Sequence, residues 1–173
     1  MTATEYPCIV IDTNVLISAG LLPNSRTAQA LAVAVEYFEI AQNAQTWHEL
    51  ETRIARKKLD RYFAPDGRLE HLIQIARSVK RVDPVSSEAV SRDSSDDKFI
   101  QLAIDAGARW IISGDADLKD IRHYKGIEIL SPLQFLQRAQ NRKPDMERLS
   151  SASKRTPEQA GQTIRTLRDE LKR

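Results

Sequence analysis

Four acidic residues of this sequence stand where a strand ends or a helix begins: Asp12, Glu49, Asp97 and Asp115. Asp12 and Asp115 each follow a short apolar run that is typical of a buried strand. Because ligands bind outside the carboxyl ends of parallel strands, we expect both at one edge of a sheet. Asp97 opens a helix that leads directly into the second strand, so its start is expected near the same edge.

Carboxylates gathered in this way would repel one another, and their pKa values would rise unless a cation neutralised them. A hard divalent ion takes oxygen ligands, whereas one cysteine and three histidines make a zinc site unexpected. A bound metal ion acidifies water and neutralises charge on a phosphoryl oxygen. The pattern therefore predicts Mg²⁺ or Mn²⁺ at the sheet edge and hydrolysis of a phosphodiester bond.

Each of these acids also has a purely structural interpretation. Asp12 and Asp115 could cap the helices that follow them. Residues 46–49 and 94–97 both match the capping box, in which the acid bonds a backbone N–H at a helix start. The acid of the first box could also pair with Arg53, one helical turn later. The gathering of four acids at one edge favours a site over four separate caps.

Strands and helices alternate along the chain. Strands are expected at residues 9–11, 38–41, 110–112 and 127–130, and helices at 25–38, 46–59, 67–80, 96–106 and from 131 onward. This alternation predicts a three-layer α/β/α sandwich with a central parallel sheet and right-handed crossovers.

The chain divides into one domain and an appendage. Residues 1–140 form the expected domain, whose core closes at Leu136, and residues 141–155 read as a polar linker. Residues 156–173 predict an amphipathic C-terminal helix, a helical extension that could dock on its own domain, on a second copy or on another protein. Basic residues are in excess in this last part of the chain, which indicates a phosphate-binding arm or a solvated tail.

Composition places the protein among globular domains, with 41% apolar and 29% charged residues. No apolar run is long enough to cross a bilayer, so no membrane association is expected. The first residues lack the basic start and apolar core of a signal peptide, and the lone Cys8 cannot form an internal disulfide. These features predict a cytoplasmic protein.

Five motifs in the right order resemble those of PIN-domain nucleases, over residues 6 to 137. The opening motif is IDTNVLIS at residues 11–18, and the second comprises EL at 49–50 with RKKLDRY at 56–62. The third is RDSSDDKF at 92–99, the fourth ISGDADL at 112–118, and IEILSPLQFL at 127–136 matches the closing strand and helix. The sequence is most similar to the PIN toxins of bacterial type II toxin–antitoxin pairs.

The resemblance implies a metal-dependent endoribonuclease that uses Mg²⁺ or Mn²⁺. It also implies an RNA substrate, a cognate antitoxin protein as inhibitor, and a homodimer. Residues beyond about 141 are not part of the motifs, so the resemblance assigns them nothing.

Carried over residue by residue, the resemblance makes Asp12, Glu49, Asp97 and Asp115 the catalytic acids. Asp12, Asp97 and Asp115 would ligate the metal, with Asp117 as a substitute, and Glu49 would act through water. The supporting residues would be Asn14 and Ser113, which hold the carboxylates by hydrogen bonds. The third motif contains three aspartates, so a one-residue change of register would make Asp93 or Asp96 the ligand.

Two further hypotheses use the same residues differently. A catalytically silent PIN-like module would bind RNA or protein, and the four filled acidic positions disfavour it. A phosphotransfer enzyme with Asp12 as nucleophile would carry a second aspartate two residues on, where this chain has Asn14. A basic group on the second acidic helix could hold RNA phosphates or form a solvated face. Its members are Arg53, Arg56, Lys57 and Lys58.

Overall fold

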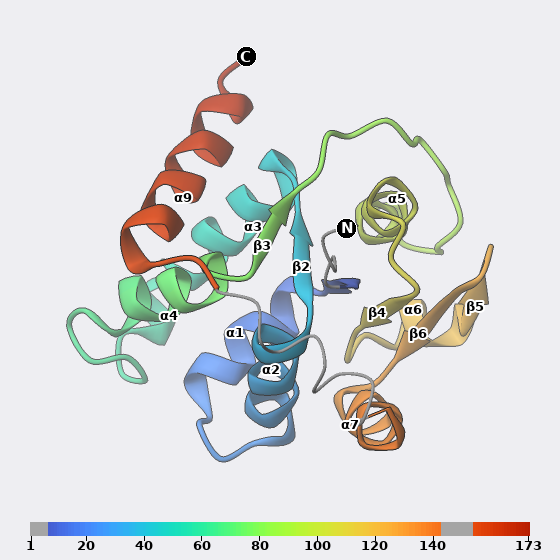
Figure 1. Cartoon of the computed structure of the whole chain (residues 1–173), viewed down its shortest axis with the longest axis horizontal. Coiled ribbons are helices and arrows are strands. Elements are labelled where there is room, and N and C mark those ends of the chain that lie inside the picture. The colour runs from blue at the N-terminus through green and yellow to red at the C-terminus, as the bar shows by residue number, and fades with distance from the viewer. Residues whose placement is uncertain (1–6, 143–153) are drawn as a thin grey trace, which may run out of the picture.

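A computed structural model describes residues 7–142 and 154–173 of the chain (Figure 1). The elements are β1 (Cys8–Ile11), α1 (Thr13–Leu21), α2 (Arg26–Tyr37), β2 (Glu39–Gln42), α3 (Ala44–Ile54), the short 3₁₀ helix η1 (Lys57–Leu59), α4 (Gly67–Ala76), β3 (Val79–Arg81), α5 (Asp97–Ala106), β4 (Trp110–Ile112), α6 (Ala116–Ile121), β5 (His123–Tyr124), β6 (Ile127–Leu130), α7 (Pro132–Asn141) and α9 (Pro157–Leu171). No helix within these ranges is long and apolar enough to span a membrane.

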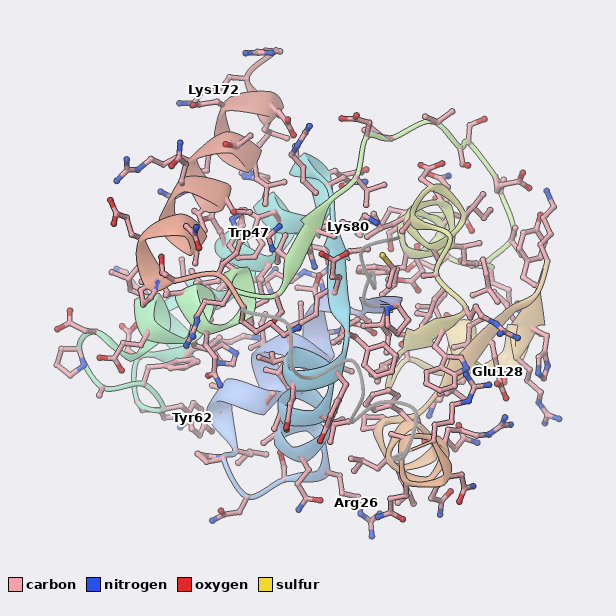
Figure 2. The ribbon with its side chains drawn as sticks, viewed as in Figure 1. Arg26, Trp47, Tyr62, Lys80, Glu128 and Lys172 are labelled. Carbon is pink, nitrogen blue, oxygen red and sulfur yellow. The ribbon has the colours of Figure 1, made fainter. Side chains whose placement is uncertain are left out.

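The six strands form one sheet in the order β3-β2-β1-β4-β6-β5. Figure 2 shows Lys80 on β3 and Glu128 on β6, toward the two ends of this order. Every neighbouring pair is parallel except β5 with β6, which is antiparallel. The turn between β5 and β6 has positive φ at Lys125 (47°) and Gly126 (81°), as two-residue hairpins of type I′ require. The predicted α/β sandwich is confirmed, and the parallel sheet gains an antiparallel edge.

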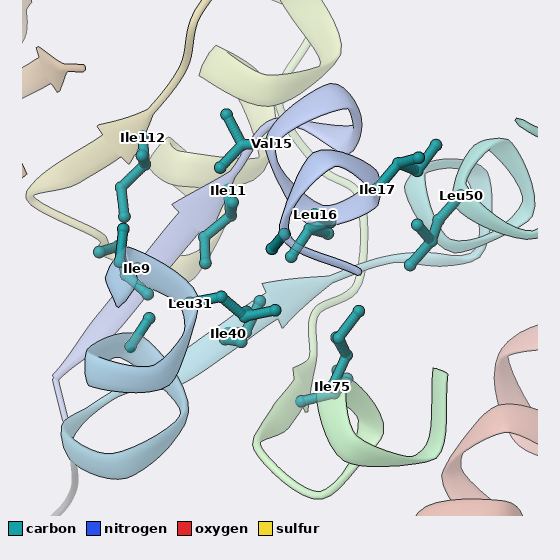
Figure 3. Close-up of a cluster of buried hydrophobic side chains, with 14 of the residues drawn as sticks. Ile9, Ile11, Val15, Leu16, Ile17, Leu31, Ile40, Leu50, Ile75 and Ile112 are labelled. Atoms are coloured by element: carbon teal, nitrogen blue, oxygen red, sulfur yellow. The ribbon is translucent and has the colours of Figure 1, made fainter. Parts of the chain in front are cut away.

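Helices cover both faces of the sheet, because side chains alternate between faces along each strand. On β1, Ile9 and Ile11 pack into one apolar cluster, whereas Val10 packs into the other. The first cluster is covered by α1, α2, α3, α4, α7 and α9, and part of it is shown in Figure 3. The second cluster is covered by α5 and α6. The result is three layers with a core on each side of the sheet.

Local sequence signals set most helix ends. Gly107 ends α5 in the left-handed conformation, with φ of 64°, and Ser131 starts α7 through a capping box with Gln134. The helix expected over 46–59 begins at Ala44 instead, because Asn43 is its cap, and its end separates as η1. The helix expected to reach residue 80 stops at Ala76, where the chain turns to pair β3 with β2.

The C-terminal helix α9 docks on its own domain, which resolves the open question of its partner. It lies beside α3 and α4 in Figure 1, and its side chains Ala160, Ile164 and Leu167 are buried in the same core as β1. The guanidinium of Arg168 holds the Glu51 carboxylate through Nε and Nη2, at 2.9 and 2.6 Å. The core therefore does not close at Leu136. Residues 143–153 of the predicted linker lie outside the described residues.

Candidate active site

The order of the strands reverses at the centre of the sheet, between β1 and β4. From β1 the chain builds β2 and β3 on one side, and then returns to place β4 on the other side of β1. Asp12 directly follows β1, and Ser113 directly follows β4. The backbone ladder continues between them, because Asp12 N–H donates to the Ile112 carbonyl at 2.9 Å. Open α/β sheets bind ligands at such a switch point, so the predicted edge is the right place to search.

Asp12 is held rigidly at this point. It is the N-cap of α1, and its Oδ1 accepts from the backbone N–H of Asn14 at 2.6 Å. Its Oδ2 accepts from the Ser113 hydroxyl, also at 2.6 Å. The side-chain contact expected from Ser113 is therefore present, whereas Asn14 acts through its backbone. Capping and site formation are compatible functions of one carboxylate.

Burial dominates the electrostatics of Asp12, which is 4% exposed. Desolvation raises the pKa of its carboxyl, and the nearby charge of Asp115 raises this pKa further. The hydrogen bonds from Ser113 and Asn14 and the charge of Arg53 lower the same pKa, but desolvation outweighs them. A buried carboxylate beside a second carboxylate is a position where a cation would be stabilised.

Asp115 is linked to Asp12 through Ser113. The Ser113 hydroxyl oxygen accepts from the Asp115 backbone N–H at 3.0 Å while it donates to Asp12. Asp115 caps α6, where its Oδ1 accepts from the N–H of Asp117 at 2.8 Å. The carboxylate is half-buried beside a shallow cleft. The cleft is lined by Asn14, Val15, Ser18, Thr27, Gly114, Asp115 and Pro132.

The two adjacent aspartates at the start of α5 face different surroundings. Asp97 is 5% exposed, and its Oδ1 accepts two backbone hydrogen bonds, from Val90 at 3.0 Å and from Ser91 at 2.6 Å. This carboxylate ties the segment that precedes the helix onto α5. Asp96 is the N-cap of α5, but its side chain makes no capping hydrogen bond. The capping box expected over 94–97 does not form.

Asp96 belongs electrostatically to the acids of the sheet edge. Its pKa is raised to about 6, first by desolvation and then by the charges of Asp115, Asp93 and Asp12, against the lowering effect of Lys98. The charges of Asp12 and Asp115 therefore reach Asp96.

Glu49 is engaged by cations. It projects from α3, where its Oε1 lies 3.3 Å from Nη2 of Arg53, and its Oε2 pairs with the ammonium of Lys98. Arg53 also donates from Nη1 to the Asn14 side-chain oxygen at 3.2 Å. The pairing with Arg53 predicted from the sequence is confirmed. The capping interpretation of Glu49 is wrong, because Asn43 and Thr46 form the capping box of α3.

Lys98 was not singled out from the sequence, although a signal for it exists. A lysine in the first turn of a helix is disfavoured by the helix dipole. Lys98 occupies that position in α5 with its side chain only 12% exposed. Its partner Glu49 on α3 explains why a cation is tolerated there. The other basic residues of the predicted group, Arg56, Lys57 and Lys58, are exposed after α3, away from this pairing.

The oxygen donors at the sheet edge have the right chemistry for a divalent metal ion, but they are not yet arranged around one point. The carboxylates of Asp12, Asp96 and Asp115 offer oxygen ligands, and their mutual repulsion would be relieved by a divalent cation. Within the described ranges, however, no three Asp, Glu, His or Cys side chains are close enough to form a ready metal-binding group. Metal binding would draw the three carboxylates together.

Two comparisons with known proteins found similar sequences. The family model described as "PIN domain" matches residues 8–117. An uncharacterised protein of Methanocaldococcus jannaschii, MJ1680, is 32% identical over 116 residues, which cover 66% of this chain and 74% of that protein. PIN domains are generally nucleases, and they typically use divalent metal ions. Because the family model matches more than half of the chain, the chain belongs to the PIN-domain family.

Proposed function

We propose that this protein is a metal-dependent endoribonuclease that hydrolyses phosphodiester bonds in RNA. The observation that carries the proposal is the placement of Asp12 and Asp115 at the switch point of the sheet, where Ser113 contacts both residues. Asp96 has its pKa raised to about 6 by burial and by the charges of Asp115, Asp93 and Asp12. Carboxylates in such a shared field are typical of sites that bind a divalent cation.

In this proposal Asp12, Asp96 and Asp115 hold Mg²⁺ or Mn²⁺. When bound, the ion would acidify a water molecule and neutralise charge on the phosphoryl oxygen. The chain's own residues fix the geometry. Ser113 and the Asn14 N–H each hold one oxygen of Asp12, so that this carboxylate keeps one orientation. Ser113 also orients the backbone of Asp115. Asp117 is a reserve ligand on the first turn of α6.

The biological setting of the proposal comes from the similarity of the motifs to PIN toxins. We infer that the protein is the toxin of a toxin–antitoxin pair, that it works in the cytoplasm, and that a cognate antitoxin inhibits it. A homodimer is part of the same proposal. RNA rather than DNA as substrate also rests on this similarity.

One observation favours a second function. The described residues contain no ready group of three metal-binding side chains, and Glu49 is already neutralised by Arg53 and Lys98. A PIN-like module that binds RNA or protein without cleaving it would have this arrangement.

Cleavage of a mixed RNA pool distinguishes the two functions. We expect the purified full-length protein to cut single-stranded RNA in Mn²⁺ or Mg²⁺ and to lose this activity in EDTA. A single-stranded DNA of matching sequence serves as the substrate control. Intact RNA in both metals, together with no effect of Mn²⁺ on the melting temperature, would leave the silent module as the better proposal.

The pH dependence of metal binding follows from Asp96. A ligand must be deprotonated, and the pKa of Asp96 is raised to about 6. Mn²⁺ should therefore bind about tenfold more weakly at pH 5 than at pH 7. Because the folded protein holds this proton more tightly than the unfolded chain, the contribution of Asp96 to stability in EDTA should improve as pH falls through 6 toward 4. Calorimetric titration and thermal melting would measure the two effects, and Asp96→Ala should remove both.

A further inference from the structure

Two cations converge on Glu49 at the mouth of the acidic site. Arg53 lies one turn further along α3, and Lys98 comes from the first turn of α5. Arg53 simultaneously reaches Asn14, which follows Asp12 on α1, and its charge lowers the pKa of Asp12. Lys98 in turn lowers the pKa of Asp96. Arg53 therefore contacts α1 two residues after Asp12, and Lys98 lies two residues after Asp96 in the first turn of α5.

The contacts of the Glu49 carboxylate leave one of its two oxygens poorly satisfied, so another anion could replace it between the two cations. Its Oε1 is buried and makes no hydrogen bond, since the Arg53 guanidinium approaches at 3.3 Å without hydrogen-bond alignment. The Lys98 ammonium has a second contact, because it lies 5.2 Å from the centre of the neighbouring Phe99 ring. The cations are thus pre-positioned, while one oxygen of the acid is poorly satisfied.

A metal ion is a poor partner for Glu49 in this setting. A divalent cation bound to its carboxylate would lie beside both the ammonium of Lys98 and the guanidinium of Arg53, and like charges at such distances repel. A phosphate group suits the two cations better than Glu49 does. Guanidinium and ammonium groups bind phosphate oxygens through charge-assisted hydrogen bonds, and phosphate offers several anionic oxygens at once.

We propose that Arg53 and Lys98 form a binding site for a backbone phosphate of the nucleic-acid substrate, and that Glu49 occupies this site as a phosphate substitute in the free protein. The phosphate would be a neighbour of the scissile one, because the two cations flank Asp12 and Asp96. The inference rests on the proposed nuclease function. It assigns Glu49 the role of an internal competitor in the free protein, beside the predicted role of a catalytic acid that acts through water.

RNA binding in EDTA tests this assignment without cleavage or metal. The probe is a short fluorescently labelled single-stranded RNA of mixed sequence, and its affinity is measured at several salt concentrations. Lys98→Gln and Arg53→Gln should each weaken binding about tenfold and reduce the salt slope by about 0.7, the value for one phosphate of a single strand. Glu49→Gln should tighten binding about tenfold, because the competing carboxylate loses its charge.

Matched variants separate this effect from net charge and from folding. Lys172→Gln at the C-cap of α9 and Glu158→Gln in its first turn change the same charges at exposed positions and should leave affinity within twofold. Figure 2 shows Lys172 at the C-terminal end of the chain. Glu49→Asp keeps the charge on a shorter side chain and should tighten binding less than Glu49→Gln, and thermal melting confirms that each variant is folded.

The outcomes distinguish the site from the proposed function. Unchanged or weaker binding by Glu49→Gln, or unchanged binding by Lys98→Gln and Arg53→Gln, would overturn the phosphate site even if the wild type cleaves RNA in Mn²⁺. If the affinities change as expected but the wild type does not cleave RNA, the phosphate site would be supported and the proposed nuclease function would be overturned. A wild type that neither binds nor cleaves would overturn both.

Discussion

Asp12→Asn should abolish metal-dependent cleavage while leaving the protein folded and at least as stable. The substitution removes one negative ligand from the centre of the site, and a bound metal ion supplies several kcal/mol of transition-state stabilisation. A loss of about a thousandfold in kcat/KM is therefore expected. Asparagine is as good an N-cap as aspartate, so the bond from Asn14 to the cap oxygen is kept.

The free energy of unfolding of Asp12→Asn tests whether the ionised carboxylate is unfavourable in the folded protein. Burial raises the pKa of Asp12, and Asp115 adds repulsion, so the ionised carboxylate is unfavourable in the folded protein without metal. Removing the charge should leave the free energy of unfolding at pH 7 unchanged or higher, as measured by denaturant titration in EDTA. Asp120→Asn, an exposed change on α6, is the control for charge. Normal cleavage by Asp12→Asn would show that the site lies elsewhere.

The position of the site could be predicted because strand ends are strongly encoded. Three β-branched residues end in Asp12, and two isoleucines precede Ser113, so buried strands and the polar residues after them are readable without a structure. Parallel strands then force both sets of side chains to one edge. The hydrogen bond between Ser113 and Asp12 is the direct consequence of this pairing.

The register of the third motif could not be read in the same way. One residue along a helix rotates the side chain by about 100°, so adjacent aspartates at a helix start face different surroundings. Asp97 turns toward the backbone of Val90 and Ser91, whereas the pKa of Asp96 is raised by desolvation and by the charges of the other acids. The segment before α5 has no apolar periodicity, and its path over Asp97 is therefore not encoded in a pattern.

Contacts between distant elements account for the remaining differences. The pairing of Lys98 with Glu49 joins α5 to α3, and nothing in the local sequence of either helix specifies it. The sequence predicted the apolar stripe of α9, but such a stripe can pack on any complementary apolar surface and does not specify its partner. The structure places Ala160, Ile164 and Leu167 in the main core, which only the three-dimensional packing could decide.

Asp96→Ala and Asp97→Ala form a matched pair that tests the register directly. The residues are adjacent and lose the same charge, but their contacts differ. Asp96→Ala should weaken Mn²⁺ binding and cleavage by about a hundredfold, because a ligand is lost. Its stability should be maintained or improved, since this carboxyl makes no capping bond and is repelled by its neighbours.

Asp97→Ala should have the opposite profile. It leaves the N–H groups of Val90 and Ser91 without their acceptor, which should lower the free energy of unfolding by about 2–4 kcal/mol. Mn²⁺ affinity, measured calorimetrically well below the melting temperature, should stay within a few-fold of the wild type. If Asp97→Ala instead lost the metal while Asp96→Ala retained it, Asp97 would be the ligand. Both backbone hydrogen bonds of Asp97 end on Oδ1, so Oδ2 would then be the oxygen that binds the metal.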